Sequence, residues 1–138
     1  MSRVLILMGS ESDRERMERA VPILEDAGVE VEVAVSSAHR EPDRTAEFAR
    51  TAEEKGFGVV ICGAGLSAAL PGVVAAHTRL PVIGVPLSAA LGGLDALLST
   101  VQMPPGVPVA CVGIDNSNNA AHLALRILGV PPGGAGGS

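Results

Sequence analysis

Short apolar segments alternate with longer segments of helical periodicity along almost the whole chain, and this alternation limits the possible folds more than any other feature. The first apolar segment, Arg3–Met8, is continuous and ends at Gly9, as expected for a strand that is covered on both faces. Asp13–Ala27 then carries apolar residues at helical intervals and stops at Gly28. The chain therefore begins with one strand–loop–helix unit.

The same unit repeats toward the end of the chain. Strands are predicted at Arg3–Met8, Val29–Val35, Gly58–Cys62, Pro81–Val85 and Val107–Val112. Helices are predicted at Asp13–Ala27, Pro42–Lys55, Ser67–Thr78, Leu94–Thr100 and Asn118–Leu128. This order predicts an α/β fold of three layers, flavodoxin-like or Rossmann-like, in which helices cover both faces of a five-stranded parallel sheet. Ligands of such folds bind beyond the carboxyl ends of the strands.

The length of the chain matches one domain. Its 138 residues, 47% of them hydrophobic, suffice for a core without disulfides or metal. Residues 1–130 are therefore predicted to form a single α/β domain. Residues 131–138 contain only Pro, Gly, Ala and Ser, which bury little, and they are predicted to form a flexible tail.

Charge and residue types limit the partners of this domain. A net charge of -5 without a Lys/Arg run disfavours nucleic acid and anionic membranes, and 1% aromatic residues leave no platform for stacking bases. No apolar stretch reaches membrane-spanning length, and the early first strand leaves no room for a signal peptide, so a cytoplasmic protein is expected. Cys62 and Cys111 lack the spacing of metal ligands, so no metal is expected. A small-molecule ligand fits these features best.

The loop after the first predicted strand, Gly9–Asp13, is a candidate ligand site. Gly9 lets a ligand approach the backbone, and the hydroxyl of Ser10 lies at the positive end of the following helix. The spacing of Ser10 with Asp13, or of Ser12 with Glu15, is also that of a capping box. Helix capping alone explains the pattern, and the two roles are compatible.

The loop after the second predicted strand, Ser36–Glu41, is the segment of the chain whose side chains are best suited to catalysis. The imidazole of His39 can take and return protons, while Arg40 can hold a phosphate group with two parallel hydrogen bonds. A solvated turn is the alternative for a single His-Arg pair. Its position beyond the end of a strand favours a functional role.

The loop after the third predicted strand, Gly63–Gly65, is followed by Ala68 with the spacing of a dinucleotide fingerprint. That fingerprint wants an acidic residue about twenty positions further on, and none occurs before Asp95, which disfavours NAD. The glycines therefore predict close approach of the backbone to another ligand or to a neighbouring helix. His77 and His122 lie on predicted helices without partners at a useful spacing, and no catalytic role is expected for them.

Seven ordered blocks between about Arg3 and Val130 carry a resemblance to a known family. They are Met8–Asp13, Ser37–Pro42, Leu70–Gly72 together with Leu80–Pro86, Gly93–Ser99, Gln102–Pro104, Gly106–Val109 and Asn119–Ala121. In these blocks the chain resembles the N5-carboxyaminoimidazole ribonucleotide mutases and aminoimidazole ribonucleotide carboxylases. The resemblance implies an enzyme of purine biosynthesis that binds an imidazole ribonucleotide and uses neither metal, ATP nor organic cofactor.

The resemblance also implies roles for individual residues. His39 matches the catalytic histidine, which shuttles a proton while carbon dioxide is held in the pocket beside the attacking carbon. Asp13 is suited to ribose hydroxyls and Arg40 to the phosphate. The implied substrate-binding residues are Gly9, Ser10, Asp13, Ser37, Ala38, Arg40, Gly63, Ala64, Gly65, Ser67 and Leu70. The family assembles as an octamer with sites at subunit contacts, so a homo-oligomer is expected.

One segment departs from the family pattern. Where the family usually reads Ala-Gly-Gly-Ala-Ala-His-Leu-Pro-Gly, this chain has Ala69 in place of the histidine. The departure fits a tolerated variation in which water or Ser67 fills the gap, a shifted substrate, or a lost activity. Arg40 resembles the mutase branch, since the carboxylase branch commonly carries Lys there. The mutase, an isomerase, is therefore the main hypothesis. One alternative is a carboxy-lyase, either a direct aminoimidazole ribonucleotide carboxylase or a related carboxylase or decarboxylase that acts on another heteroaromatic nucleotide. A further alternative is a non-catalytic nucleotide-binding oligomer.

Overall fold

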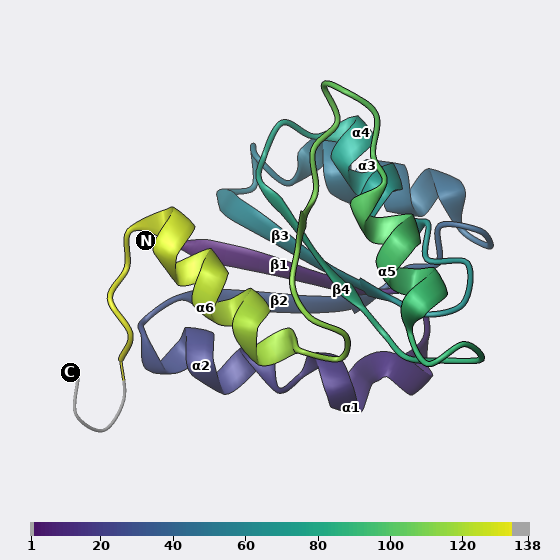
Figure 1. Ribbon diagram of the computed structural model, residues 1–138. Coiled ribbons are helices and arrows are strands. Elements are labelled where there is room, and N and C mark those ends of the chain that lie inside the picture. Colours follow the sequence, from purple (N-terminus) through teal and green to yellow (C-terminus); the bar gives the residue numbers. More distant parts are fainter. Residues whose placement is uncertain (1, 134–138) are drawn as a thin grey trace.

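The computed structural model describes residues 2–133 and has the predicted α/β fold (Figure 1). Within these residues, five strands form one sheet in the order β2-β1-β3-β4-β5, and all neighbouring strands are parallel. This is the strand order of flavodoxin-like folds. The strands are β1 (Arg3–Met8), β2 (Glu30–Val35), β3 (Phe57–Ala64), β4 (Val82–Pro86) and β5 (Ala110–Cys111). The helices are η1 (Glu11–Asp13, a 3₁₀ turn), α1 (Arg14–Met17), α2 (Ala20–Asp26), α3 (Pro42–Thr51), α4 (Leu70–His77), α5 (Leu94–Val101) and α6 (Ser117–Leu128).

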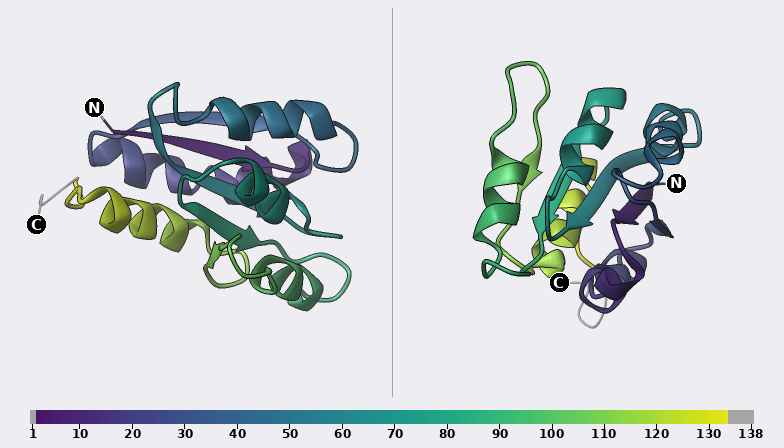
Figure 2. Two further views of the ribbon diagram at one scale, coloured as in Figure 1. Left: turned by 90° about the horizontal axis from the view of Figure 1, so that it is seen from above. Right: turned by 90° about the vertical axis from the view of Figure 1, so that its right-hand side faces the viewer.

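The helices cover both faces of the sheet (Figure 2). They enclose two hydrophobic cores. Helices α1, α2 and α6 pack on one face, while α3, α4 and α5 pack on the other. Successive residues of β1 belong to different cores: Ile6 packs in the first and Leu7 in the second, and both side chains are fully buried. This two-sided burial is the reason why the first strand is continuously apolar.

The predicted helix Asp13–Ala27 is wrong as a single element. The structure divides it into η1, α1 and α2, and the chain turns at Glu18 and Arg19. Pro22 explains the break, because it has no backbone N–H and its ring would clash with the carbonyl of Glu18 in a continuous helix. Pro22 instead lies in the first turn of α2, where proline is tolerated.

Other boundaries differ from the predicted ones for local reasons. The predicted strand Val107–Val112 shrinks to β5, an edge strand in which Pro108 lies outside the paired residues. Helix α4 begins at Leu70 rather than Ser67, because Ser67 has the left-handed φ of +51°. Helix α3 ends at Thr51 rather than Lys55, and residues 52–56 form turns up to Gly56, whose φ is +89°.

The C-terminal residues and the lengths of the helices bear on two further predictions. Of the predicted tail, residues 131–133 form neither helix nor strand, and residues 134–138 lie outside the described residues. In the part of the chain that the structure covers, every helix is too short or too polar to cross a lipid bilayer.

Candidate functional site

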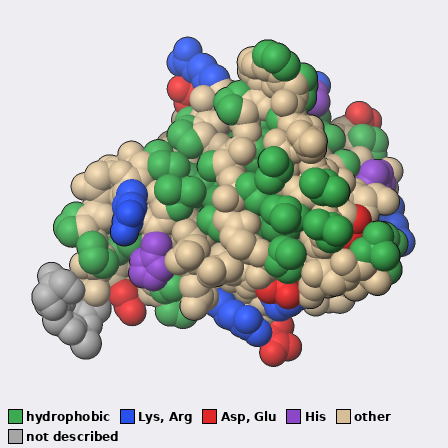
Figure 3. Space-filling model, in the orientation of Figure 1, with side chains coloured by type: hydrophobic (Ala, Val, Ile, Leu, Met, Phe, Trp, Pro, Cys, Tyr) green, Lys and Arg blue, Asp and Glu red, His purple; other side chains and the backbone are tan. Residues whose placement is uncertain are grey.

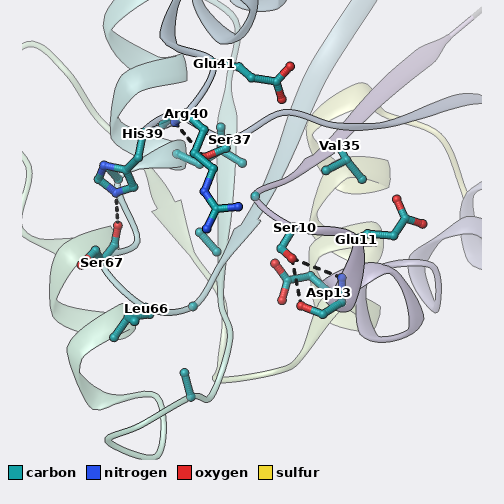
Figure 4. Close-up of a pocket in the computed structure, with 18 of the residues that line it drawn as sticks. Ser10, Glu11, Asp13, Val35, Ser37, His39, Arg40, Glu41, Leu66 and Ser67 are labelled. Carbon is teal, nitrogen blue, oxygen red and sulfur yellow. Dashed lines mark hydrogen bonds between the residues drawn. The ribbon is translucent and has the colours of Figure 1, made fainter.

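The loops after β1, β2, β3 and β4 surround one cavity of about 780 Å³ at the carboxyl edge of the sheet (Figure 4). Parallel strands bring these loops together because all of their carboxyl ends lie at the same edge. The predicted site residues that line the cavity are Gly9, Ser10, Asp13, Ser37, Ala38, His39, Arg40, Ala64, Gly65, Ser67 and Leu70. The structure thus gathers side chains that are separated by up to sixty positions in the sequence.

Gly63 is the predicted site residue that does not line the cavity. It lies in β3, and its carbonyl accepts a hydrogen bond of 3.2 Å from the backbone N–H of Gly9. A Cβ atom at this position would overlap the Sδ atom of Met17, which is fully buried in α1. The absence of a side chain at Gly63 therefore lets α1 pack against the end of the sheet beneath the cavity.

The loop after β1 presents a nearly buried carboxylate to the cavity. Ser10 caps η1, since its Oγ accepts a hydrogen bond from the N–H of Ser12 at 3.3 Å. The Asp13 carboxylate pairs with Arg16 at 3.1 Å. Asp13 is only 7% exposed, and burial raises its pKa above the ordinary value, while Arg16 and a hydrogen bond from the backbone N–H of Ser10, as in a capping box, oppose this rise.

The imidazole of His39 is held by one backbone group. Its Nε2 lies 2.8 Å from the carbonyl oxygen of Ser67 (Figure 4). A carbonyl oxygen can only accept, so Nε2 carries a hydrogen and the neutral ring has its lone pair on Nδ1. Ser67 has a left-handed φ of +51°, and its carbonyl also accepts a bond of 2.6 Å from the N–H of Ala69. The geometry therefore fixes the ring and leaves Nδ1 available to take and return a proton.

Internal hydrogen bonds of the loop after β2 hold His39 and Arg40 at the cavity. The buried hydroxyls of Ser36 and Thr45 bond each other at 2.7 Å, which ties the end of β2 to α3. The Oγ of Ser37 accepts the backbone N–H of Arg40 at 3.1 Å. Among residues 2–133, Arg40 takes part in no ion pair with an acidic side chain, and its guanidinium extends into the cavity (Figure 4). It is therefore free to bind an anionic group of a ligand.

The sequence analysis missed part of the lining. The missed residues are Glu11, Ser12, Arg16, Val35, Glu41, Leu66, Ala69, Ser88 and Ala89. Ser88 and Ala89 follow β4, so the rule that located the other loops applies to them as well. Arg16 lies three residues after Asp13, a spacing at which helical side chains meet. Asp95 and Gln102–Pro104 also follow β4 in the sequence but do not line this cavity.

The cavity offers chemistry for a small polar ligand. It combines one imidazole with a fixed orientation, one guanidinium that faces the cavity, and a carboxylate next to serine hydroxyls. These groups suit a ligand that carries an anionic group and hydroxyls, and a reaction that moves a proton. Within the described part of the chain, no three His, Cys, Asp or Glu side chains cluster as metal ligands do.

The fold and the cavity define a class: a flavodoxin-like α/β domain whose cavity at the carboxyl ends of its strands is lined by an imidazole, a guanidinium and a carboxylate. The model of the family "AIR carboxylase" matches residues 3–132, and the chain belongs to this family. The resemblance of the seven sequence blocks to that family is thereby confirmed.

Individual relatives agree with the family match. The chain is 60% identical over 131 residues to the N5-carboxyaminoimidazole ribonucleotide mutase of Pyrococcus abyssi, covering 94% of this chain and 75% of that protein. It is 56% identical over 124 residues to the phosphoribosylaminoimidazole carboxylase of Schizosaccharomyces pombe, covering 89% of this chain and 22% of that protein. The crystal structure of Treponema denticola PurE superposes with a TM-score of 0.81 at 30% identity, covering 94% of this chain and 81% of that chain.

Proposed function

We propose that this protein is a cytoplasmic N5-carboxyaminoimidazole ribonucleotide mutase, an isomerase that forms 4-carboxy-5-aminoimidazole ribonucleotide in de novo purine biosynthesis. The observation that carries the proposal is His39, whose Nε2 is bound to the Ser67 carbonyl at the cavity, so that Nδ1 is left to exchange a proton. Support comes from the 60% identity to the Pyrococcus abyssi protein of that name. Arg40 directly after His39 also matches the mutase branch.

The reaction moves a carboxyl group and a proton in opposite directions. The bond between the exocyclic nitrogen and the carboxyl carbon breaks, and protonated His39 gives a proton to this nitrogen. The imidazole C4 of the substrate then attacks the released carbon dioxide, and His39 takes back the proton that C4 loses. Atoms and charges balance without a cofactor or metal. A cavity that keeps carbon dioxide beside C4 supplies the proximity that this step needs.

The remaining lining residues bind and orient the nucleotide in this proposal. Arg40 takes the phosphate group, because its guanidinium faces the cavity without an acidic partner among the described residues. Asp13 accepts hydrogen bonds from the ribose hydroxyls, with Ser10 and Gly9 beside it. The rest of the proposed lining comes from the loop after β2 and from the segment between the end of β3 and the start of α4: Ser37, Ala38, Ala64, Gly65, Ser67 and Leu70.

Two parallel assays test the proposal. One supplies freshly generated N5-carboxyaminoimidazole ribonucleotide at low bicarbonate, and the other supplies aminoimidazole ribonucleotide at raised bicarbonate. We expect the first to form 4-carboxy-5-aminoimidazole ribonucleotide rapidly. Turnover only in the second assay would assign a direct carboxylase. Silence in both, with a folded protein, would contradict both assignments.

Ala69 favours a second candidate function. It lines the cavity where the family usually carries a histidine, so the cavity lacks an imidazole next to the substrate. The alternative is a carboxylase or decarboxylase that acts on another heteroaromatic nucleotide, and a further one is a nucleotide-binding oligomer without catalysis. Thermal shifts with aminoimidazole ribonucleotide and with pyridine nucleotides test for a different substrate, and tight binding without turnover would point to the non-catalytic oligomer. Activity that appears only in Ala69→His would assign its absence to the missing imidazole.

Exposed apolar side chains on α5 support a homo-oligomer, which we propose to be the octamer of the family. Leu94 is 58% and Leu98 is 50% exposed, and Leu91, Val101 and Ile114 are exposed as well. Hydrophobic side chains gather in a patch over α5 (Figure 3). A monomer rarely leaves such a patch in water. Size-exclusion chromatography with light scattering is expected to show an assembly that Leu94→Asp with Leu98→Asp reduces to smaller species. Exchange of the exposed Ile127 of α6 for Asp serves as the control, and a monomeric wild type would contradict the proposal.

A further inference from the structure

One guanidinium connects three loops at the carboxyl edge of the sheet. Arg16 in α1 donates from Nη2 to the Asp13 carboxylate at 3.1 Å. Its Nη1 donates to the Asp115 carboxylate and to the backbone carbonyl of Ser88, both at 3.0 Å. Asp13 follows β1, Ser88 follows β4, and Asp115 follows β5. The side chain of Arg16 is 27% exposed and lines the cavity beside Asp13.

Asp115, the second carboxylate that Arg16 contacts, is itself held by hydrogen bonds. The Asp115 carboxylate accepts the backbone N–H of Ser88 at 2.9 Å and the Ser88 hydroxyl at 2.6 Å. The backbone N–H of Asp115 donates to the carbonyl of Pro86 at 2.8 Å, and its φ is +60°, a conformation that aspartate tolerates. Asp115 therefore fixes the position of the guanidinium independently of the first loop.

The backbone of Arg16 is anchored as well. The hydroxyl of Ser117, which is 1% exposed at the start of α6, donates to the carbonyl of Arg16. Strand β3 lies between β1 and β4 in the sheet, so Arg16 must reach across the end of β3. It can do so because Gly63 leaves room for Met17, the next residue of α1. Arg16 is thus held at both ends, and the carboxylate of Asp13 is placed by it.

The charges around Asp13 make its ion pair with Arg16 important. Asp13 and Asp115 share one guanidinium, and burial raises the pKa of Asp13 while Arg16 opposes the rise. Glu11 of η1 is paired with Arg14 instead. From the loop after β2, the cationic Arg40 and the imidazole of His39 face the same cavity. Arg16 is therefore the cation that compensates the buried charge of Asp13 in the unliganded site.

We propose that Arg16 is a positioning residue for the ligand site. It holds the Asp13 carboxylate in the orientation and in the charged form that accept hydrogen bonds from the ligand's hydroxyls, and the loops after β4 and β5 keep Arg16 in place. This inference rests on the proposed function in one respect, namely that Asp13 binds the ligand. The claim that Arg16 controls the orientation and charge of Asp13 does not depend on the proposed function.

Replacement of Arg16 by glutamine tests the proposal. Without the guanidinium, the pKa of Asp13 rises further above its ordinary value, so the carboxylate is protonated over a wider range of acidic pH. A hydrogen bond to a charged group is worth a change in affinity of roughly ten- to hundredfold. We expect calorimetry with aminoimidazole ribonucleotide to show binding weakened by about that factor, and the acidic limb of the affinity–pH curve to move to higher pH. Arg16→Lys should restore part of the affinity.

Arg19→Gln is the matched control, because Arg19 closely follows the same helix, is exposed and does not line the cavity. It should leave the curve unchanged. NMR titration of the Asp13 carboxyl carbon in the unliganded protein tests the effect of Arg16 on Asp13 by itself, whatever the substrate proves to be. An Arg16→Gln variant with the same Asp13 pKa and the same affinity–pH curve as the wild type would overturn the proposal, even if its melting temperature fell. An inactive wild type whose Asp13 still responds to Arg16→Gln would count against the proposed function alone.

Discussion

Replacement of His39 by asparagine is expected to lower the turnover number for N5-carboxyaminoimidazole ribonucleotide by a factor of about 10²–10⁴, the usual contribution of general acid–base catalysis. The reason is that the Nδ1 atom moves the proton in the proposed mechanism, and an amide does not titrate. The fold should persist, because His39 is exposed and its imidazole is held by one hydrogen bond, to the carbonyl of Ser67. Steady-state kinetics at several pH values measures the effect.

A second histidine, His122, provides the control for His39→Asn. His122 lies exposed on α6 and outside the cavity, so His122→Asn should retain wild-type kinetics. The affinity of His39→Asn for aminoimidazole ribonucleotide should stay within a few-fold of wild type, since Arg40 and Asp13 are unchanged. Full activity of His39→Asn would sink the proposed role of the imidazole. A parallel loss of affinity and turnover would assign His39 to binding instead.

The fold was predictable where the pattern of residues reports burial directly. The uninterrupted apolar residues of β1 predict burial on both faces, and the structure places Ile6 and Leu7 in separate cores. The division of the first helix was harder to predict, because apolar spacing continues across Pro22 while the backbone cannot. Strand β5 was too long in the prediction, since its length depends on pairing with β4 alone at the edge of the sheet.

The site was predictable as far as it follows from strand ends. The rule that loops after parallel strands carry the ligand site located His39, Arg40 and Asp13. It could not show that Arg16 and Asp115, which are 99 positions apart, form an ion pair. That contact depends on how α1 packs against the sheet and on the backbone conformation of Asp115, and neither leaves a periodic pattern in the sequence. The role of Gly63 in packing against Met17 depends on the same tertiary contact.

Replacement of Gly63 by alanine is expected to lower the free energy of unfolding by about 1–3 kcal/mol, the usual cost of overpacking a core. The added Cβ would overlap the Sδ atom of Met17 and also approach its Cγ at 3.0 Å. Met17 has no exposed surface and therefore little room to move aside. Urea denaturation measures the loss. The matched control is Gly9→Ala, because a Cβ at Gly9 meets nothing within 4 Å.

The cause of this loss can be isolated with a second substitution. Met17→Ala alone should cost about 2–5 kcal/mol, since it leaves a cavity under α1. In that background the Cβ of Gly63→Ala would fill part of the cavity, so the same substitution should become neutral or stabilising. The coupling between the two residues should then amount to about 0.5–3 kcal/mol. An equal cost of Gly63→Ala in both backgrounds would mean that Met17 is not the residue it displaces. Because α1 also carries Arg16, Gly63→Ala alone should weaken nucleotide binding as well. Adding Met17→Ala should not restore this binding fully, since the support of the ligand site depends on the position of α1.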